Sequence, residues 1–236
     1  MASSTTPQLP PNVQVSQHPC LRAKLSQLRS QSTPAKYVKT LVNEIALMVA
    51  YEALAVSTQA TDGPKDATPL RFEFTSTEIT PGRICLVPIL RSGLGMVEAV
   101  QTILPNPVPV HHLGLYREPS TLEPVEYYNN LPNQLAADGS GSAPGGVSDL
   151  AIVLDPVIAT GGTCAAAIQT LREWGVKRIL VLAVIGAAEG VRRAAAEWAD
   201  ATDIWIAGID DELTPNGMLK PGLGDVGDRL FLTIGK

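Results

Sequence analysis

The segment from Leu150 to Ile168 constrains the fold of this chain more than any other. Its first five residues, Leu150 to Leu154, are apolar without alternation, which is typical of a strand buried on both faces. Asp155 and Pro156 follow, then a short turn, a run of small residues that ends at Thr163, and an Ala-rich stretch. The sequence therefore predicts a strand, a Gly/Thr-rich loop and a helix in succession, the repeating unit of parallel α/β proteins.

The loop between this strand and this helix has the composition of an anion site. The first amides of a helix lack intrahelical partners, and the helix dipole adds partial positive charge there. Gly161 and Gly162 let the backbone approach a phosphate closely, and Thr160 and Thr163 add hydroxyl donors. Asp155 ends the strand, at the edge where ligands of open α/β sheets bind. The alternative is that the two glycines form only a bare strand-to-helix connection.

The rest of the chain alternates between helical and extended patterns. We expect helices over residues 19–29, 34–56, 92–104, 162–174 and 188–198. We expect strands over residues 70–75, 83–90, 108–115, 150–154, 178–185, 203–209 and 230–234. A turn is expected over 61–68, and a mobile loop or hairpin over 116–132. The fold class is α/β, with a mainly parallel sheet flanked by helices.

One domain accounts for most of the chain. With 236 residues the chain is long enough for a single domain, which we place at 16–236 after a Pro-rich, disordered tail at 1–15. Residues 134–148 are Ala, Gly, Ser and Asp in low-complexity order, and they predict a solvated insertion.

Composition excludes several classes of partner. A net charge of −5 and a pI near 5.2 give no general affinity for nucleic acid or for an anionic membrane. The start of the chain has no secretory pattern, and the longest apolar run, 179–184 extended to 188, is too short to span a bilayer. Cys20, Cys85 and Cys164 are widely spaced and odd in number, which fits reduced thiols. We therefore expect a cytoplasmic protein.

Two more candidate anion sites are expected at the same edge of the sheet as the first: Arg91 to Gly93 after a strand, and Tyr116-Arg117 at the base of the loop. A fourth feature, the Gly-rich run 220–228, adds closely approachable backbone and two carboxylates. Several phosphate-binding segments together with several acids indicate a polyphosphorylated substrate that carries Mg²⁺.

Familiar nucleotide-binding motifs are absent from these segments. The loop after Asp155 lacks the lysine of a P-loop, and Glu98 stands where a Gly-x-Gly-x-x-Gly motif needs its last glycine. His111 and His112 face opposite sides of a strand, so at most one could enter a site, and a structural role is favoured.

Four sequence blocks resemble the uracil phosphoribosyltransferase family. They are VPILRSGLGM, GLYREPSTLEPVEYY, VLDPVIATGGT and KPGLGDVGDRLF, in the order of that family. HPCLRAKLSQLRS and AYEA are similar to its N-terminal helices, so the resemblance covers roughly residues 17–234. It implies a type I phosphoribosyltransferase fold with a C-terminal hood. It also implies transfer of ribose-5-phosphate from phosphoribosyl diphosphate (PRPP) to uracil, which gives UMP and pyrophosphate.

The resemblance assigns roles to individual residues. The run that would bind PRPP, with its last five residues around the 5′-phosphate, is Asp155, Pro156, Val157, Ile158, Ala159, Thr160, Gly161, Gly162 and Thr163. Arg91, in a turn that family members often build with a cis peptide bond, and Arg117 would meet the pyrophosphate. Asp225 would contact the ribose hydroxyls or Mg²⁺, and Arg91, Arg117 and Asp225 are the implied catalytic residues. The residues that would bind uracil are Met218, Leu219, Gly224, Asp225 and Val226.

The resemblance further implies a homodimer or a higher homo-oligomer, with the apolar N-terminal helices suited to the interface, and GTP as an effector. The chain departs from the family at Met218, where many relatives have an aromatic residue, at Lys220 and at Ser92. Two alternatives therefore stay open: a phosphoribosyltransferase for another base, and a non-catalytic sensor of PRPP or nucleotide. Because phosphate binding alone does not require Arg91, Arg117 and Asp225 together, an enzyme is favoured over a sensor.

Overall fold

The computed structural model describes residues 9–118, 121, 123–132 and 147–233. Within these ranges the helices are α1 (Pro19–Arg29), α2 (Ala35–Ser57), α3 (Leu94–Ile103), α4 (Gly162–Trp174), α5 (Ala188–Glu197) and α6 (Val226–Phe231). The strands are β1 (Val13–Val15), β2 (Gln59–Ala67), β3 (Glu73–Thr80), β4 (Ile84–Leu90), β5 (Leu113–Arg117), β6 (Pro124–Asn129), β7 (Leu150–Leu154), β8 (Val157–Ile158), β9 (Arg178–Ala183), β10 (Ile185–Ala187), β11 (Thr202–Ile206), β12 (Ile209–Asp210), β13 (Glu212–Leu213) and β14 (Leu219–Lys220). The five predicted helices are confirmed, with bounds that differ by no more than two residues.

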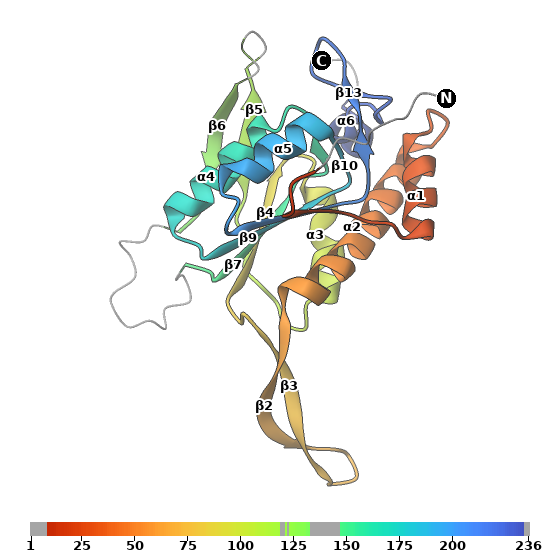
Figure 1. The fold of residues 1–236 in the computed structure, drawn as a ribbon. Helices are drawn as coiled ribbons and strands as arrows, with labels where there is room; N and C mark the ends of the chain where they lie inside the picture. The colour runs from red at the N-terminus through yellow and green to blue at the C-terminus, as the bar shows by residue number, and fades with distance from the viewer. Residues whose placement is uncertain (1–8, 119–120, 122, 133–146, 234–236) are drawn as a thin grey trace.

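The main sheet confirms the predicted fold class. In the described part of the chain its strand order is β1-β11-β9-β7-β4-β5-β6. Neighbouring strands are parallel throughout, except that β5 and β6 form an antiparallel hairpin. Helices α1, α2 and α3 cover one face of the sheet, and α4 and α5 cover the other (Figure 1).

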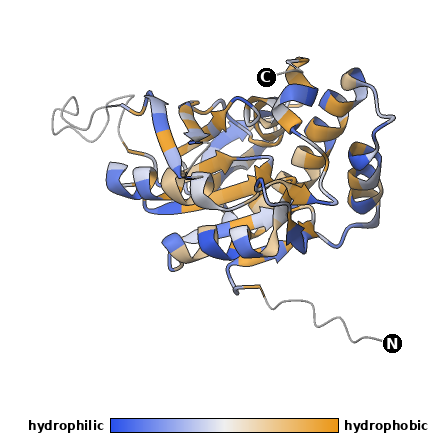
Figure 2. Ribbon diagram, turned by 90° about the horizontal axis from the view of Figure 1, so that it is seen from above, coloured by the Kyte–Doolittle hydropathy of each residue, from blue (hydrophilic) through white to orange (hydrophobic). Residues whose placement is uncertain are grey.

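The central strands are uninterrupted apolar runs because the sheet has a core on each face. In β7, Leu150, Ile152 and Leu154 pack into the core with α1, α2 and α3. Ala151 and Val153 point to the opposite side and pack with α4 and α5. Figure 2 shows the hydrophobic residues gathered along the strands between the two helical layers.

Helix α2 belongs to the interior of the protein. By length and composition alone it could cross a membrane, and it is the one helix of the described ranges that passes this test. Half of its most apolar stretch is nevertheless buried within the protein, and Val42, Ile45 and Val49 have no exposed surface. It packs against α1, α3 and β9, so it is a core helix.

A second, smaller sheet lies beyond the carboxyl ends of the main strands. The strands predicted over 178–185 and 203–209 each break in two, and the short pieces β10 and β12 pair with β8. After these breaks the chain leaves the main sheet and forms the second one, next to the edge at which the ligand site was expected.

Two predictions near the N-terminus are wrong in part. Residues 13–15 do not belong to a disordered tail, because β1 pairs in parallel with β11, while residues 1–8 lie outside the described ranges. The expected turn at 61–68 is strand β2, and the next strand begins at Glu73 instead of Leu70. This hairpin projects from the body, so both of its faces are largely exposed and its sequence has no buried-face pattern (Figure 1).

Other boundaries also need correction. The predicted last strand at 230–234 is wrong: residues 226–231 form α6, because Asp225 caps its first turn by accepting a hydrogen bond from the Asp228 amide at 3.0 Å. The strand predicted at 108–115 starts only at Leu113, and Val110 makes a single bridge to Leu86. The loop or hairpin at 116–132 is a hairpin in its described part. Most of the insertion expected at 134–148 lies outside the described residues, which omit 133–146.

Candidate functional site

A cleft of about 320 Å³ opens at the carboxyl ends of the central strands. Four segments that are far apart in the sequence meet there: the turn after β4, the end of β5, the loop between β7 and α4, and the segment before α6. The predicted site residues that line it are Arg91, Asp155, Val157, Ile158, Ala159, Thr160, Gly161, Thr163, Met218, Leu219, Gly224, Asp225 and Val226. Two predicted residues lie behind this lining. The Pro156 carbonyl accepts the amides of Val184 and Ile185, and Gly162 is buried in the first turn of α4.

The loop before α4 has its shape because it packs on α5. Gly161 has a φ of +78°, and a Cβ atom there would lie 2.1 Å from the Gly190 carbonyl oxygen. A Cβ on Gly190 would lie 1.9 Å from the Ala159 carbonyl oxygen. Sequence reasoning missed Gly190, since only the tertiary contact reveals its role. Two glycines facing each other thus let the loop bend around the start of α4.

The thiol of Cys164 and the carboxylate of Asp155 share the floor of the cleft. Asp155 is 6% exposed and Cys164 is 1% exposed. Burial, and then the nearby Asp155 charge, raise the pKa of the Cys164 thiol well above its usual value. The thiol stays protonated near neutral pH, so it is not suited to act as a nucleophile.

The turn after β4 places a cation at the cleft. The Leu90–Arg91 peptide bond is cis. A Cβ on Gly93 would lie 2.3 Å from the Leu154 carbonyl oxygen, so the turn packs directly on the end of β7. The Arg91 side chain donates to the Asp228 carboxylate at 3.2 Å and to the Thr233 hydroxyl at 3.0 Å. The turn is therefore in contact with α6 and the residues after it.

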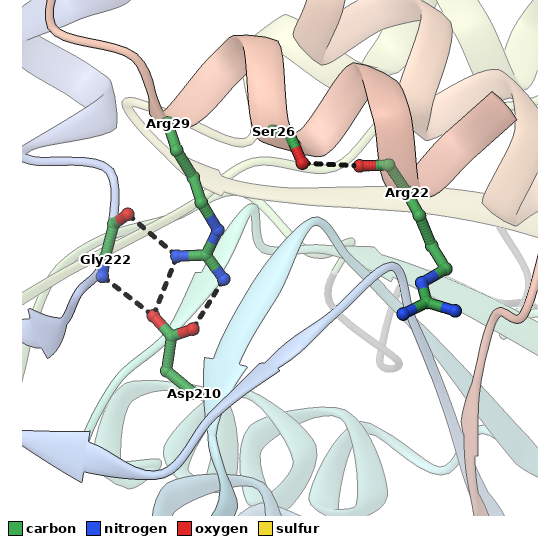
Figure 3. A network of polar contacts seen from close by, with 5 residues as sticks. All are labelled: Arg22, Ser26, Arg29, Asp210 and Gly222. Atoms are coloured by element: carbon green, nitrogen blue, oxygen red, sulfur yellow. Dashed lines mark hydrogen bonds and ion pairs between the residues drawn. The ribbon is translucent and has the colours of Figure 1, made fainter. Parts of the chain in front are cut away.

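The segment from β12 to α6 forms the hood over the cleft. Figure 3 shows how α1 anchors it: the Arg29 guanidinium pairs with the Asp210 carboxylate and donates to the Gly222 carbonyl at 2.8 Å. The Gly222 amide donates back to Asp210 at 2.8 Å. Asp210 is 4% exposed, so this ion pair is largely removed from water. Sequence reasoning missed Arg29 and Asp210, which lie 181 residues apart.

The two family departures in the hood differ in their relation to the cleft. Met218 lines the cleft and is half-buried, and its amide donates to the Thr214 hydroxyl at 3.1 Å. Lys220 does not line it, and its ammonium binds Glu212 at 2.7 Å on the neighbouring strand. Of these two positions, only Met218 is in contact with the cleft.

The hairpin contributes its base to the cleft. Tyr116 lines the cleft, is 48% exposed, and lies 6.1 Å from Tyr127 between ring centroids. The backbone of Arg117 pairs with Pro124, but its side chain lies outside the described part of the structure.

The adjacent histidines lie outside the cleft lining. His111 packs edge-on against Trp174, with ring centroids 5.6 Å apart. Burial, and then His112, lower the pKa of His111, so it is neutral at pH 7. The expected structural role of this pair is in keeping with these contacts.

The described residues hold no group of three His, Cys, Asp or Glu side chains that could ligate a metal by themselves. Two cleft carboxylates, Asp155 and Asp225, are present. This donor set fits Mg²⁺ that arrives with a substrate, because Mg²⁺ commonly binds one or two carboxylates together with substrate phosphates.

Comparisons with known proteins agree with this geometry. A family model described as uracil phosphoribosyltransferase matches residues 15–233. A curated protein of that name from Roseiflexus sp. (strain RS-1) is 41% identical over 228 residues, which cover 94% of this chain and 98% of that protein.

Solved structures show the same fold. The AQ2163 protein from Aquifex aeolicus matches with a TM-score of 0.81 at 28% identity, over 94% of this chain and 98% of its own. Adenine phosphoribosyl transferase from Trypanosoma brucei, solved with AMP, pyrophosphate and ribose-5-phosphate, matches with a TM-score of 0.51 at 15% identity. That match covers 85% of this chain and 84% of the other, and it shows a shared type I phosphoribosyltransferase fold.

Proposed function

The chain belongs to the uracil phosphoribosyltransferase family, and on this premise we propose that its cleft converts uracil and PRPP to UMP and pyrophosphate. The observation that carries the proposal is the meeting of two distant segments across one cleft. The loop at 159–163 provides phosphate-binding groups, and the hood at 218–226 faces it with backbone and Met218.

The 5′-phosphate of PRPP is proposed to bind at the start of α4. Thr160, Gly161 and Thr163 line the cleft there, and Gly162 begins the helix directly behind them. A substrate phosphate would satisfy donors that the helix itself cannot pair. Asp155 lies at the end of β7, where it can face the ribose.

Transfer of the ribosyl group to a base nitrogen passes through an oxocarbenium-like centre as pyrophosphate departs. The chain must neutralise the leaving group, align the base and exclude water; it does not have to supply a nucleophile. Arg91 is placed to meet the pyrophosphate, and Arg117 is proposed to approach it from the hairpin. Tyr116 and the hairpin are proposed to close over the loaded cleft.

The hood is proposed to read uracil mainly through its backbone. Gly224 has a φ of +78° and lines the cleft together with Leu219 and Val226. An imide edge requires alternating donors and acceptors, which successive peptide groups can supply. Met218 is proposed to pack against the face of the base, as a thioether can.

Mg²⁺ is proposed to enter with PRPP and to be held in part by Asp225. When bound, it would neutralise charge on the pyrophosphate. Asp225 also lies where it can accept hydrogen bonds from the ribose hydroxyls.

A homodimer is proposed, with the β2–β3 hairpin in contact with the partner. An isolated two-stranded hairpin is only marginally stable in water. This hairpin nevertheless exposes Leu70, Phe72 and Phe74, which are 78%, 69% and 44% accessible. Helix α2 exposes Tyr51 and Val56 near its base. Light scattering on the wild type and on a Phe72→Ser/Phe74→Ser variant tests this proposal, and a monomeric wild type contradicts it.

Two further proposals concern location and regulation. A cytoplasmic location rests on the composition of the chain and agrees with three free cysteines. Activation by GTP rests on the family alone, and rates with and without GTP test it.

The catalytic proposal is tested by supplying PRPP, Mg²⁺ and one base at a time and following pyrophosphate release. Release with uracil is expected. Release only with a base other than uracil would contradict the assigned substrate. This second candidate, a phosphoribosyltransferase for another base, is tested because Met218 stands at the cleft. PRPP binding without turnover on any base would indicate a sensor instead of an enzyme.

A further inference from the structure

The Arg91 guanidinium belongs to a closed ring of hydrogen bonds. It donates to the Thr233 hydroxyl at 3.0 Å and to an Asp228 carboxylate oxygen, Oδ1, at 3.2 Å. The Thr233 hydroxyl in turn donates to the same oxygen at 2.6 Å. The donors and acceptors are consistent around the ring, because the hydroxyl accepts from the arginine and passes its own hydrogen to the carboxylate.

This ring leaves Arg91 able to bind an anion. A guanidinium has about five N–H donors, and the ring uses only a part of them. Arg91 lines the cleft, whereas Asp228 and Thr233 do not. The Asp228 carboxylate therefore holds the guanidinium from outside the cleft lining, and the remaining N–H groups of Arg91 take no part in the ring.

The ring also connects the turn after β4 to the hood. The Asp228 amide donates to the Asp225 carboxylate at 3.0 Å, so one residue contacts Arg91 through its side chain and Asp225 through its backbone. A Cβ on Gly227 would lie 3.8 Å from an Arg91 terminal nitrogen and 3.2 Å from Asp225. Arg91 and Asp225, which are far apart in the sequence, are thus held beside each other.

We propose that Asp228 and Thr233 are positioning residues that hold the Arg91 guanidinium in place for the pyrophosphate of PRPP. This inference rests on the proposed function. It adds that the residues after the base-reading segment, and not only the turn itself, determine how the leaving group is bound. Arg91 has a long side chain that is 46% exposed, so without these partners it would sample many rotamers.

The test uses the full chain with Asp228→Asn, Thr233→Val and the conservative Thr233→Ser. Loss of one hydrogen bond to a charged group corresponds to about a tenfold change. The kcat/KM for PRPP is therefore expected to fall about tenfold in Asp228→Asn and in Thr233→Val, and to recover in Thr233→Ser. The KM for uracil at saturating PRPP is expected to stay within about twofold, since Arg91 is assigned to the pyrophosphate and not to the base.

A double-mutant cycle separates positioning from direct contact with substrate. In an Arg91→Ala background, Asp228→Asn is expected to cause no further loss, because the guanidinium through which its carboxylate is proposed to act has been removed and its amide still contacts Asp225. Additive losses would overturn the proposal, and so would an unchanged kcat/KM in both single variants. Thermal melting identifies any variant that fails to fold. If Asp228→Asn fails to fold, the same cycle is measured with Thr233→Val.

The same cycle is measured by calorimetric PRPP binding in the absence of uracil. If the wild type does not turn over uracil, the proposed function fails, while the binding cycle still decides whether Asp228 acts through Arg91. The failures of the two proposals are therefore distinguishable.

Discussion

At the scale of single residues, Asp225 combines a structural role with a proposed chemical one. It is exposed in the cleft, and it caps α6 through its contact with the Asp228 amide. Asn caps helices about as well as Asp. Asp225→Asn therefore removes the charge and keeps the cap. We expect its turnover to fall at least about 100-fold, with an unchanged thermal midpoint.

The matched control for this variant is Asp211→Asn, which removes an exposed carboxylate of the same C-terminal region that does not line the cleft. Steady-state rates and thermal melting of both variants check the prediction. Near-normal turnover in Asp225→Asn would contradict its assigned role.

Residue types indicated the cleft but not its supports. Arg91, Asp155 and Asp225 could be selected from the sequence because each lies in a Gly-rich or strand-terminal motif whose chemistry is local. Asp228 belongs to the Gly-rich run at 220–228, but no local pattern points to its contact with Arg91, 137 residues away. No local pattern points to the packing of Gly190 on Ala159 either. The sequence therefore predicted which residues line the cleft better than which residues hold them in place.

At the scale of elements, the packing of α5 on the loop at 159–163 should control PRPP binding. Gly190 lies in the first turn of α5 and does not line the cleft. An alanine there would place Cβ 1.9 Å from the Ala159 carbonyl oxygen, so the loop or the helix must move. We expect Gly190→Ala to raise the KM for PRPP more than about tenfold and to destabilise the fold by about 1–3 kcal/mol.

Glu189→Ala, an exposed change one residue earlier in α5, is the control for this experiment. Kinetics and urea unfolding are measured on both variants. A Gly190→Ala enzyme with normal PRPP affinity would show that the loop does not depend on this contact.

The hood depends on α1 through a buried ion pair, so its removal should affect the base more than PRPP. Asp210→Asn leaves Arg29 without its carboxylate partner. Loss of one partner of a buried pair costs about 3–5 kcal/mol, and the partial exposure of Arg29 reduces this to about 2 kcal/mol here. We expect the KM for uracil to rise and the KM for PRPP to change less, as measured by kinetics at saturating co-substrate.

The control for Asp210→Asn is Glu212→Gln, which breaks an exposed pair on the outer surface of the same segment. It should leave both KM values unchanged, since exposed ion pairs contribute little. Equal effects of Asp210→Asn on the two substrates would contradict a specific role in the hood.

At the scale of the whole molecule, the predicted architecture follows from the two cores. Strands with a core on each face are continuous apolar runs, and their helices carry apolar stripes, so the periodicity of the sequence indicates both. The β2–β3 hairpin has neither signal, because most of its residues face solvent on both sides. The region that the sequence misjudged most is the one that projects from the body.

The amino edge of the sheet has an ion-pair cluster that should affect stability alone, because the cleft lies at the opposite, carboxyl edge. Asp149 precedes β7 at the amino edge, opposite the cleft, and contacts Arg83 at 2.9 Å and Lys177 at 2.8 Å. These hydrogen bonds, first from Arg83 and then from Lys177, lower the pKa of Asp149 from 3.8 to about 2. Because the pKa is lower in the folded state, the stabilisation is present above pH 4 and is lost as the pH falls toward 2.

Asp149→Asn should therefore lower the free energy of unfolding by about 1–2 kcal/mol between pH 5 and 8. This energy is already reduced to allow for the solvent exposure of both partner cations. The gap to wild type should narrow below pH 4, because the carboxylate becomes protonated first in the unfolded state and only near pH 2 in the folded state. Urea unfolding at several pH values measures this gap. The rate at pH 7 should be unchanged, because Asp149 does not line the cleft. A gap that stays constant down to pH 3 would mean that the substitution disturbs packing, and that the ion pairs at the amino edge do not stabilise the sheet.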